Sequence, residues 1–131
     1  MTDTPALRID VDGTVTALPD ASYETIHLGV GGWIEAVPTD GRIVIWVNED
    51  GKLTQLPLNP LGHVLWAQVD RYGCIAAGDW VAGPCVVTGP ADDTANTTSV
   101  PDWVLPALTA LAATVRFGAG DPAAPEAPSD R

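Results

Sequence analysis

Asn48, Lys52 and Asn59 are the polar residues of this sequence whose spacing could form a recognition site. They flank a tight turn that ends at Gly51 and a loop in which two prolines restrict the backbone. Lys52 is the only lysine of the chain. On such loops, amide and ammonium groups can bind a polar ligand. The two Asn side chains can also bond to nearby backbone and leave Lys52 in solvent, so both interpretations stay open.

Glu35 and Asp79 are the carboxylates that could act as general acid and base if the fold brings them together. This hydrolase hypothesis competes with a simpler one, because Glu35 alternates with Ile34 and Ala36 as a solvent-facing strand residue does. Nucleophilic catalysis needs a Ser or Cys beside a base and an orienting group, and no motif of that kind is present. We therefore expect no catalytic residues and a protein that is not an enzyme.

Histidines and cysteines are too few and too scattered to predict a metal site. His27 and His63 are the only histidines, and Cys74 and Cys85 form no closely spaced zinc-binding motif with them. We expect no metal and no cofactor. The two cysteines are expected to be small core residues with free thiols, although a disulfide between them stays an open alternative.

The chain is strongly acidic. Seventeen Asp and Glu residues stand against six Lys and Arg, which gives a net charge of −11. Such a chain repels phosphate backbones, so we expect no direct binding of nucleic acid. The acidity suits docking onto a protein partner with a basic surface, or mimicry of nucleic acid. It could also serve solubility alone.

A glycine-rich segment, G-V-G-G-W-I-E-A-V-P, connects a predicted helix to a predicted strand. The helix covers residues 23–28, with Ser22 as its N-cap, and ends at the glycines. Residues 33–38 then form a strand that opens with Trp33. The glycines lack the Lys and Ser or Thr of a phosphate-binding loop. Most of the five Trp residues are expected in the core, with one or two as candidates for an interaction surface.

The other patterns predict a single α+β domain over residues 1–117, built on an antiparallel sheet of about five strands. Residues 42–47 are almost continuously apolar, so we expect a central strand that is buried on both faces or nearly so. Residues 52–55 are expected to begin a further extended segment. Residues 118–131 are poor in apolar side chains and are predicted to be a disordered tail.

A C-terminal helix is predicted over Trp103–Phe117, with Asp102 as its N-cap. Val104, Leu108 and the apolar residues that follow them share one helical stripe. This stripe is expected to pack on one face of the sheet. The alternative is a second copy of the chain, which would make a homodimer.

Three short blocks in a defined order resemble the DUF3846 family. The blocks are V-G-G-W-I-E-A-V, N-E-D-G-K-L-T-Q-L-P-L-N and G-D-W-V-A-G-P-C-V-V-T-G, and the resemblance covers roughly residues 7–89. The family is one of small proteins of unknown function that are common on phages, prophages and plasmids. The resemblance implies an origin on a mobile element and supplies no catalytic residues.

We therefore expect a non-enzymatic accessory protein of a phage or mobile element that binds a host or viral protein through its acidic surface. An anti-defence role and nucleic-acid mimicry are two versions of this hypothesis. The candidate binding residues are Trp33, Glu35, Asn48, Lys52 and Asn59. The alternative is a small-molecule-binding protein with a cleft near Trp33, Lys52 and Asn59.

The sequence also predicts a location. No apolar segment is long enough to span a membrane, and Met1 to Ala6 is too short and polar for a signal peptide. We expect a cytoplasmic protein without membrane contact, which would be in the host cell cytoplasm if a phage encodes it.

Overall fold

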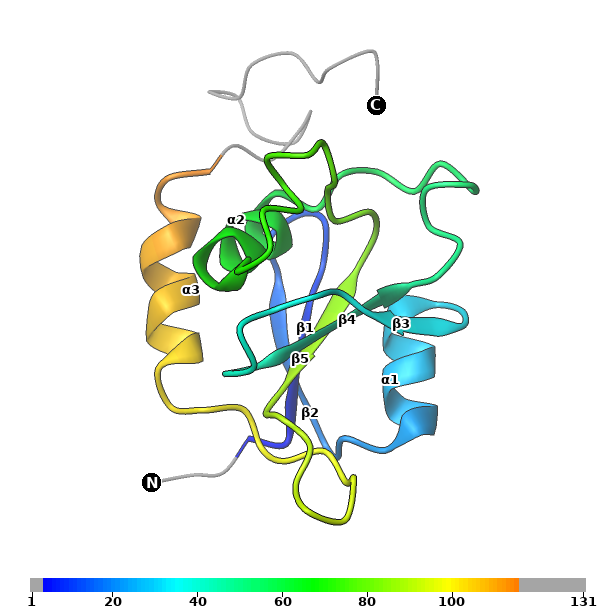
Figure 1. Cartoon of the computed structure of the whole chain (residues 1–131), viewed down its shortest axis with the longest axis vertical. Helices are drawn as coiled ribbons and strands as arrows, with labels where there is room; N and C mark the ends of the chain where they lie inside the picture. The colour runs from blue at the N-terminus through cyan, green and yellow to red at the C-terminus, as the bar shows by residue number, and fades with distance from the viewer. Residues whose placement is uncertain (1–3, 116–131) are drawn as a thin grey trace.

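A five-stranded antiparallel sheet forms the centre of the computed structural model, which describes residues 4–115 (Figure 1). The strand order is β2-β1-β5-β4-β3, and every neighbouring pair is antiparallel. The α+β class and the sheet of five strands are therefore confirmed. The predicted tail over residues 118–131 lies outside the described residues. The strands are β1 (Ala6–Ile9), β2 (Val15–Leu18), β3 (Ile34–Ala36), β4 (Val44–Asn48) and β5 (Cys85–Thr88).

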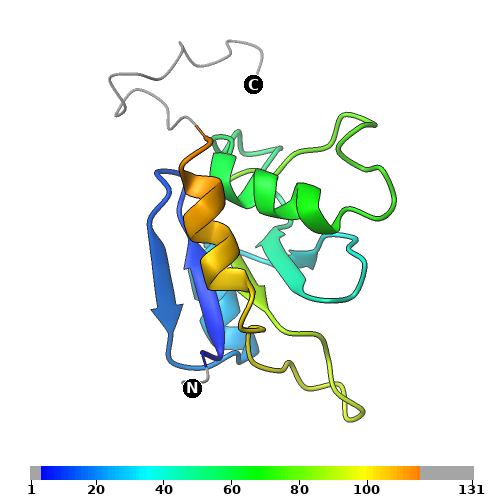
Figure 2. The same cartoon turned by 90° about the vertical axis from the view of Figure 1, so that its left-hand side faces the viewer.

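Helices cover both faces of this sheet. Helix α1 (Tyr23–Val30) lies on one face, and α2 (Pro60–Val69) and α3 (Val104–Ala112) lie on the other. Figure 2 shows α2 and α3 together on the side that faces the viewer. The predicted packing of a C-terminal helix on one face of the sheet is confirmed, and α2 shares that face with it.

β5 is the central strand, paired with β1 on one side and β4 on the other, and it is buried on both faces because helices pack on each face of the sheet. The strand predicted over residues 42–47 is β4, which is paired on both sides, with β3 and β5, but it is fully buried on only one face. In β4, Ile45 and Val47 are buried, whereas Val44 and Trp46 are half-buried under the face that α1 covers. Both helical layers approach β5 through a glycine. A Cβ on Gly29 would lie 2.8 Å from Val86 Cγ2, and one on Gly62 would lie 2.8 Å from Cys85 Sγ.

The larger core lies between the sheet and the α2–α3 face. Trp66 of α2 is fully buried there, and its indole N–H donates to the carbonyl oxygen of Pro38 at 2.8 Å. Val104 and Leu108 of α3 are buried in the same core. A smaller core under α1 contains Ile26 and Val30. The apolar stripe predicted for the C-terminal helix thus packs within the chain.

Local signals at the helix ends are only partly confirmed. The Ser22 hydroxyl caps α1, and Gly31 ends the helix with φ at +79°. By contrast, Asp102 does not cap α3, which begins after Trp103 without a side-chain cap and ends at Ala112. The predicted helix is therefore too long within the described residues, and positions 116 and 117 lie outside them. Residues 52–55 form turns, so the extended segment predicted there is also wrong.

A buried Asn59 joins the start of α2 to the sheet. Its side-chain oxygen accepts the N–H of Gly62 at 3.0 Å and caps α2. Its side-chain NH₂ donates to the carbonyl oxygens of Ile9 at 2.9 Å and Gly83 at 3.0 Å. Asn59 has no exposed surface. One amide therefore satisfies polar backbone groups of the helix, the end of β1 and the segment that leads into β5.

Asn59→Ala should lower the free energy of unfolding by about 2–5 kcal/mol, since it removes a helix cap and leaves two carbonyls without their donor. Urea unfolding monitored by tryptophan fluorescence measures this loss. Asn96→Ala, at an exposed loop position, is the control and should change the value by less than about 0.5 kcal/mol. Equal effects of the two substitutions would contradict the assigned role of Asn59.

Candidate functional site

A small pocket lies where the β3–β4 hairpin meets the loop between α2 and β5. Its volume is about 90 Å³. Its polar and aromatic lining residues are Glu35, Asn48, Glu49, Lys52, Asp79 and Trp80, and Val37, Pro38, Val47 and Ala82 complete the lining. Three of the five predicted binding residues therefore line one pocket, together with both carboxylates of the hydrolase hypothesis.

The pairing of β3 with β4 determines which side chains line the hairpin side of this pocket. Glu35 pairs with Val47 across the β3–β4 ladder, so the two side chains lie on the same face. β3 is an edge strand, and Glu35 is exposed on it, as its alternation with apolar neighbours suggests. The turn after β4 then carries Lys52 to the pocket.

An ion pair between Lys52 and Asp79 lies on the other side of the pocket. Lys52 donates to the Asp79 carboxylate, and its ammonium lies 5.7 Å from the centroid of the Trp80 ring. Asp79 also accepts the N–H of Trp80 at 2.8 Å. Both partners of the ion pair are partly exposed, so solvent screens the attraction and the pair contributes little to stability.

Asp70 organises the loop that carries Asp79 and Trp80. Its carboxylate accepts the backbone N–H of Ile75 at 2.9 Å and of Cys74 at 3.1 Å. These bonds, that from Ile75 foremost, hold the pKa of Asp70 below its ordinary value. The loop is therefore arranged by an ionised carboxylate just after the end of α2.

The two Asn residues of the predicted site serve the backbone. The side chain of Asn48 donates to the carbonyl oxygen of Val30 at 3.3 Å and accepts the N–H of Asp50 at 2.8 Å. Asn59 is fully buried and does not line the pocket. Of the two interpretations left open by the sequence, backbone hydrogen bonding describes both side chains. Lys52 is held by Asp79 and is not simply solvated.

Trp33 lies outside the pocket lining and is 63% exposed. Its carbonyl oxygen accepts the N–H of Glu49 at 2.8 Å, which places it beside the hairpin turn. The small-molecule hypothesis expects Trp33, Lys52 and Asn59 in one cleft. The structure does not bring these three residues together. The sequence prediction missed Trp80 as a lining residue, and the available signal was its position directly after Asp79.

The pocket has the size and charge for one cationic group. Glu35, Glu49 and Asp79 outnumber Lys52, which already lies near the Trp80 ring, so Glu35 and Glu49 are the carboxylates left for a further cation. Binding sites for drug-sized ligands usually measure about 300 Å³ or more, and this hollow is far smaller. Beyond placing Glu35 and Asp79 in one pocket, the structure adds no support for acid–base catalysis, because Glu35 is exposed and Asp79 is ion-paired.

The thiols are separate from each other and from this pocket. Cys74 is half-buried and Cys85 is buried, and both are free. Burial raises the pKa of Cys85 to about 12, so its thiol is not a nucleophile near neutral pH. Within residues 4–115, no group of three His, Cys, Asp or Glu side chains is arranged to hold a metal ion.

The fold and this pocket define a small α+β domain with an acidic, aromatic hollow at a sheet edge. A comparison with protein-family models matches residues 1–111 to the "Domain of unknown function (DUF3846)". The chain belongs to this family, and the resemblance seen in its sequence blocks is confirmed. Neither the curated proteins nor the solved structures gave a match. None of the helices described over residues 4–115 has the length and apolar character needed to cross a membrane.

Asp70→Asn should lower the free energy of unfolding at about pH 7, and its difference from the wild type should shrink as the pH falls below about 4. The lowered pKa stabilises the fold only while Asp70 is ionised, and protonation removes the same charge that the substitution removes. Urea unfolding at about pH 7 and about pH 3 measures both values. Asp93→Asn, in an exposed loop, is the control. A difference that does not change with pH would contradict this role of the Asp70 charge.

Proposed function

We propose that this chain is a non-enzymatic binding protein that engages a host or viral protein with a basic surface. The observation that carries the proposal is that most of the described Lys and Arg side chains form ion pairs with carboxylates of the same chain. Arg8 pairs with Asp10 at 2.7 Å, Arg42 with Asp40 at 2.8 Å, and Lys52 with Asp79. Three of the four Lys and Arg side chains described over residues 4–115 are thus ion-paired within the chain, and the remaining carboxylates dominate the surface potential there.

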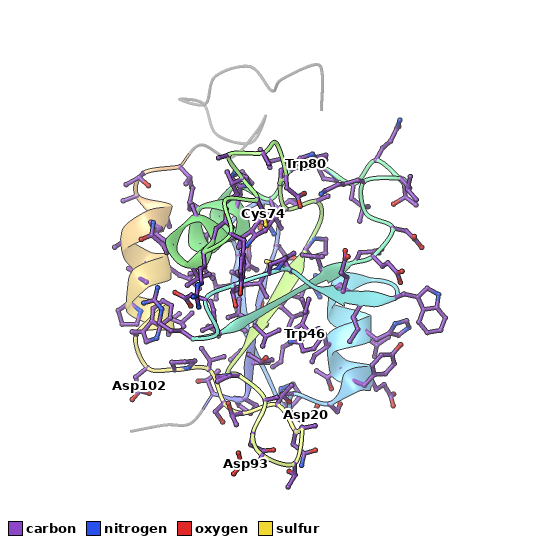
Figure 3. The ribbon with its side chains drawn as sticks, in the orientation of Figure 1. Asp20, Trp46, Cys74, Trp80, Asp93 and Asp102 are labelled. Carbon is purple, nitrogen blue, oxygen red and sulfur yellow. The ribbon has the colours of Figure 1, made fainter. Side chains whose placement is uncertain are left out.

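These carboxylates lie at several places on the surface. Figure 3 shows Asp20, Asp93 and Asp102 toward one end of the molecule and Trp80, with its acidic pocket, toward the other. Hydrogen bonding by the Thr25 side chain and by Ser22 lowers the pKa of Asp20, so it keeps its charge in mildly acidic conditions. A broad negative surface steers the approach of a positively charged partner.

The biological setting of the proposal comes from the family. DUF3846 proteins are common on phages, prophages and plasmids, so we place this chain in the cytoplasm of a bacterial host. An accessory protein there could act on a nucleic-acid enzyme, whose substrate-binding surface is basic. An anti-defence role is one form of such an interaction, and competition with nucleic acid for that surface is its physical basis.

Affinity capture from bacterial lysate should recover a DNA- or RNA-processing protein at about 0.05 M salt and lose it at about 0.5 M, because salt screens exposed charges. The substitutions Glu24→Gln, Glu35→Gln and Glu49→Gln, made together, should weaken the capture. Gln68→Ala changes an exposed, uncharged side chain and is the matched control. Capture that yields nothing above background at low salt, or that resists high salt, would contradict the proposal.

A further inference from the structure

Three aromatic rings form a row along the outer side of α1. The rings of Tyr23 and His27 are stacked, with centroids 5.7 Å apart and planes 12° apart. The Trp33 ring follows, 5.6 Å from His27 and tilted by 50°. Tyr23 is 52% exposed and Trp33 is 63% exposed. Neither the core nor the pocket at Lys52 uses these two rings, so we call the three residues the aromatic row.

The backbone holds the aromatic row in place. Tyr23 and His27 are four residues apart, which puts them on the same side of the helix. Gly31 then turns the chain back with its left-handed conformation, and Trp33 reaches the His27 ring. A Cβ on Gly32 would lie 2.7 Å from the side-chain nitrogen of Asn48, so the turn packs closely on β4. The row is a preformed surface, which reduces the entropy lost on binding.

The chain covers other partly exposed aromatic rings with its own cations. The Arg42 guanidinium lies 5.1 Å from the centroid of the Trp103 ring, and the Lys52 ammonium lies 5.7 Å from that of Trp80. Similarly, the guanidinium of Arg71 lies 5.9 Å from the centroid of its neighbour Tyr72.

The aromatic row has no such cover. The one other cation within residues 4–115, Arg8, is paired with Asp10. Among these residues, no cation therefore lies over Tyr23 or Trp33, and these rings are free to stack with a cation from another molecule.

Acidic residues are close along the chain, or through one backbone hydrogen bond, to both ends of the aromatic row. Glu24 follows Tyr23 in the first turn of α1, and Glu35 lies on the edge strand two residues after Trp33. The N–H of Glu49 bonds to the carbonyl oxygen of Trp33, which brings a third carboxylate residue to this end. Exposed aromatic faces next to carboxylates complement a guanidinium group, which stacks through its plane and donates hydrogen bonds at its edges.

We propose that the aromatic row binds arginine side chains on a basic segment of the partner protein. This inference rests on the proposed function and names both the docking surface and the residue that it recognises. Arginine is favoured over lysine because its planar, weakly hydrated guanidinium stacks on aromatic rings, whereas a lysine ammonium is a compact, strongly hydrated charge. Tyr23 and Trp33 belong to the residue types that most often dominate binding energy at interfaces.

Two synthetic peptides of equal length and charge test the proposal, one alternating Gly with Arg and the other alternating Gly with Lys. Calorimetry at low salt should show that the full chain binds the Arg peptide about 3- to 10-fold more tightly than the Lys peptide. In NMR titrations, the Trp33 indole and the Tyr23 amide should shift with the Arg peptide. Tyr23→Ala and Trp33→Ala should each remove most of the preference, and Trp33→Phe should keep most of it.

The controls are Tyr72→Ala, which removes an exposed ring already covered by Arg71, and Leu53→Ala, which removes an exposed aliphatic side chain. Neither should change the preference for arginine. Equal binding of both peptides, unaffected by Trp33→Ala, would overturn the aromatic row as an arginine site. That result would leave salt-sensitive capture of a basic partner intact, so the two proposals can fail separately. A dimer in sedimentation that Trp33→Ala converts to monomer would also overturn it, since a second copy would then occupy the row.

Discussion

The buried side chain of Asn59 connects parts of the fold that are far apart along the chain. Its amide caps α2 and bonds to carbonyls at the end of β1 and just before β5. Buried polar backbone groups need partners, and at this junction one side chain supplies three of these bonds. The same contact sets the approach of α2 to β5, where Gly62 leaves room for the Cys85 sulfur. The position of α2 and the larger core therefore depends on it.

The surface follows a second constraint, the shortage of positive charge. Arg42 and Lys52 each pair with a carboxylate and also lie over an indole ring. Because each of these cations serves both a carboxylate and an aromatic ring, few positive charges are left to contact the other carboxylates and aromatic rings of the described residues. Our two proposals follow from this imbalance. The acidic surface attracts a basic protein, and the aromatic row on α1 adds a preference for arginine that charge alone does not provide.

Several features were predictable because their causes are local. Ser22 and Gly31 delimit α1 through a hydroxyl cap and a left-handed turn, both of which are visible in the sequence. The pocket was predictable in part, since Glu35 and Lys52 were candidates. Asn59 was a candidate for binding, yet it is fully buried. An Asn at a helix start and an Asn in a binding loop have the same sequence signal, and only burial distinguishes them.

The chain's sequence alone determined the acidic character, the α+β class and the membership of DUF3846, because composition, local periodicity and ordered motifs carry that information. The tertiary structure decided that β5 is central and buried on both faces, since its pairing partners and the helices that cover it are distant in sequence. It also decided that Asp79 and Trp80 meet Lys52, and that Trp33 completes a row with Tyr23 and His27. These contacts join residues through the packing of separate elements, which no local pattern records.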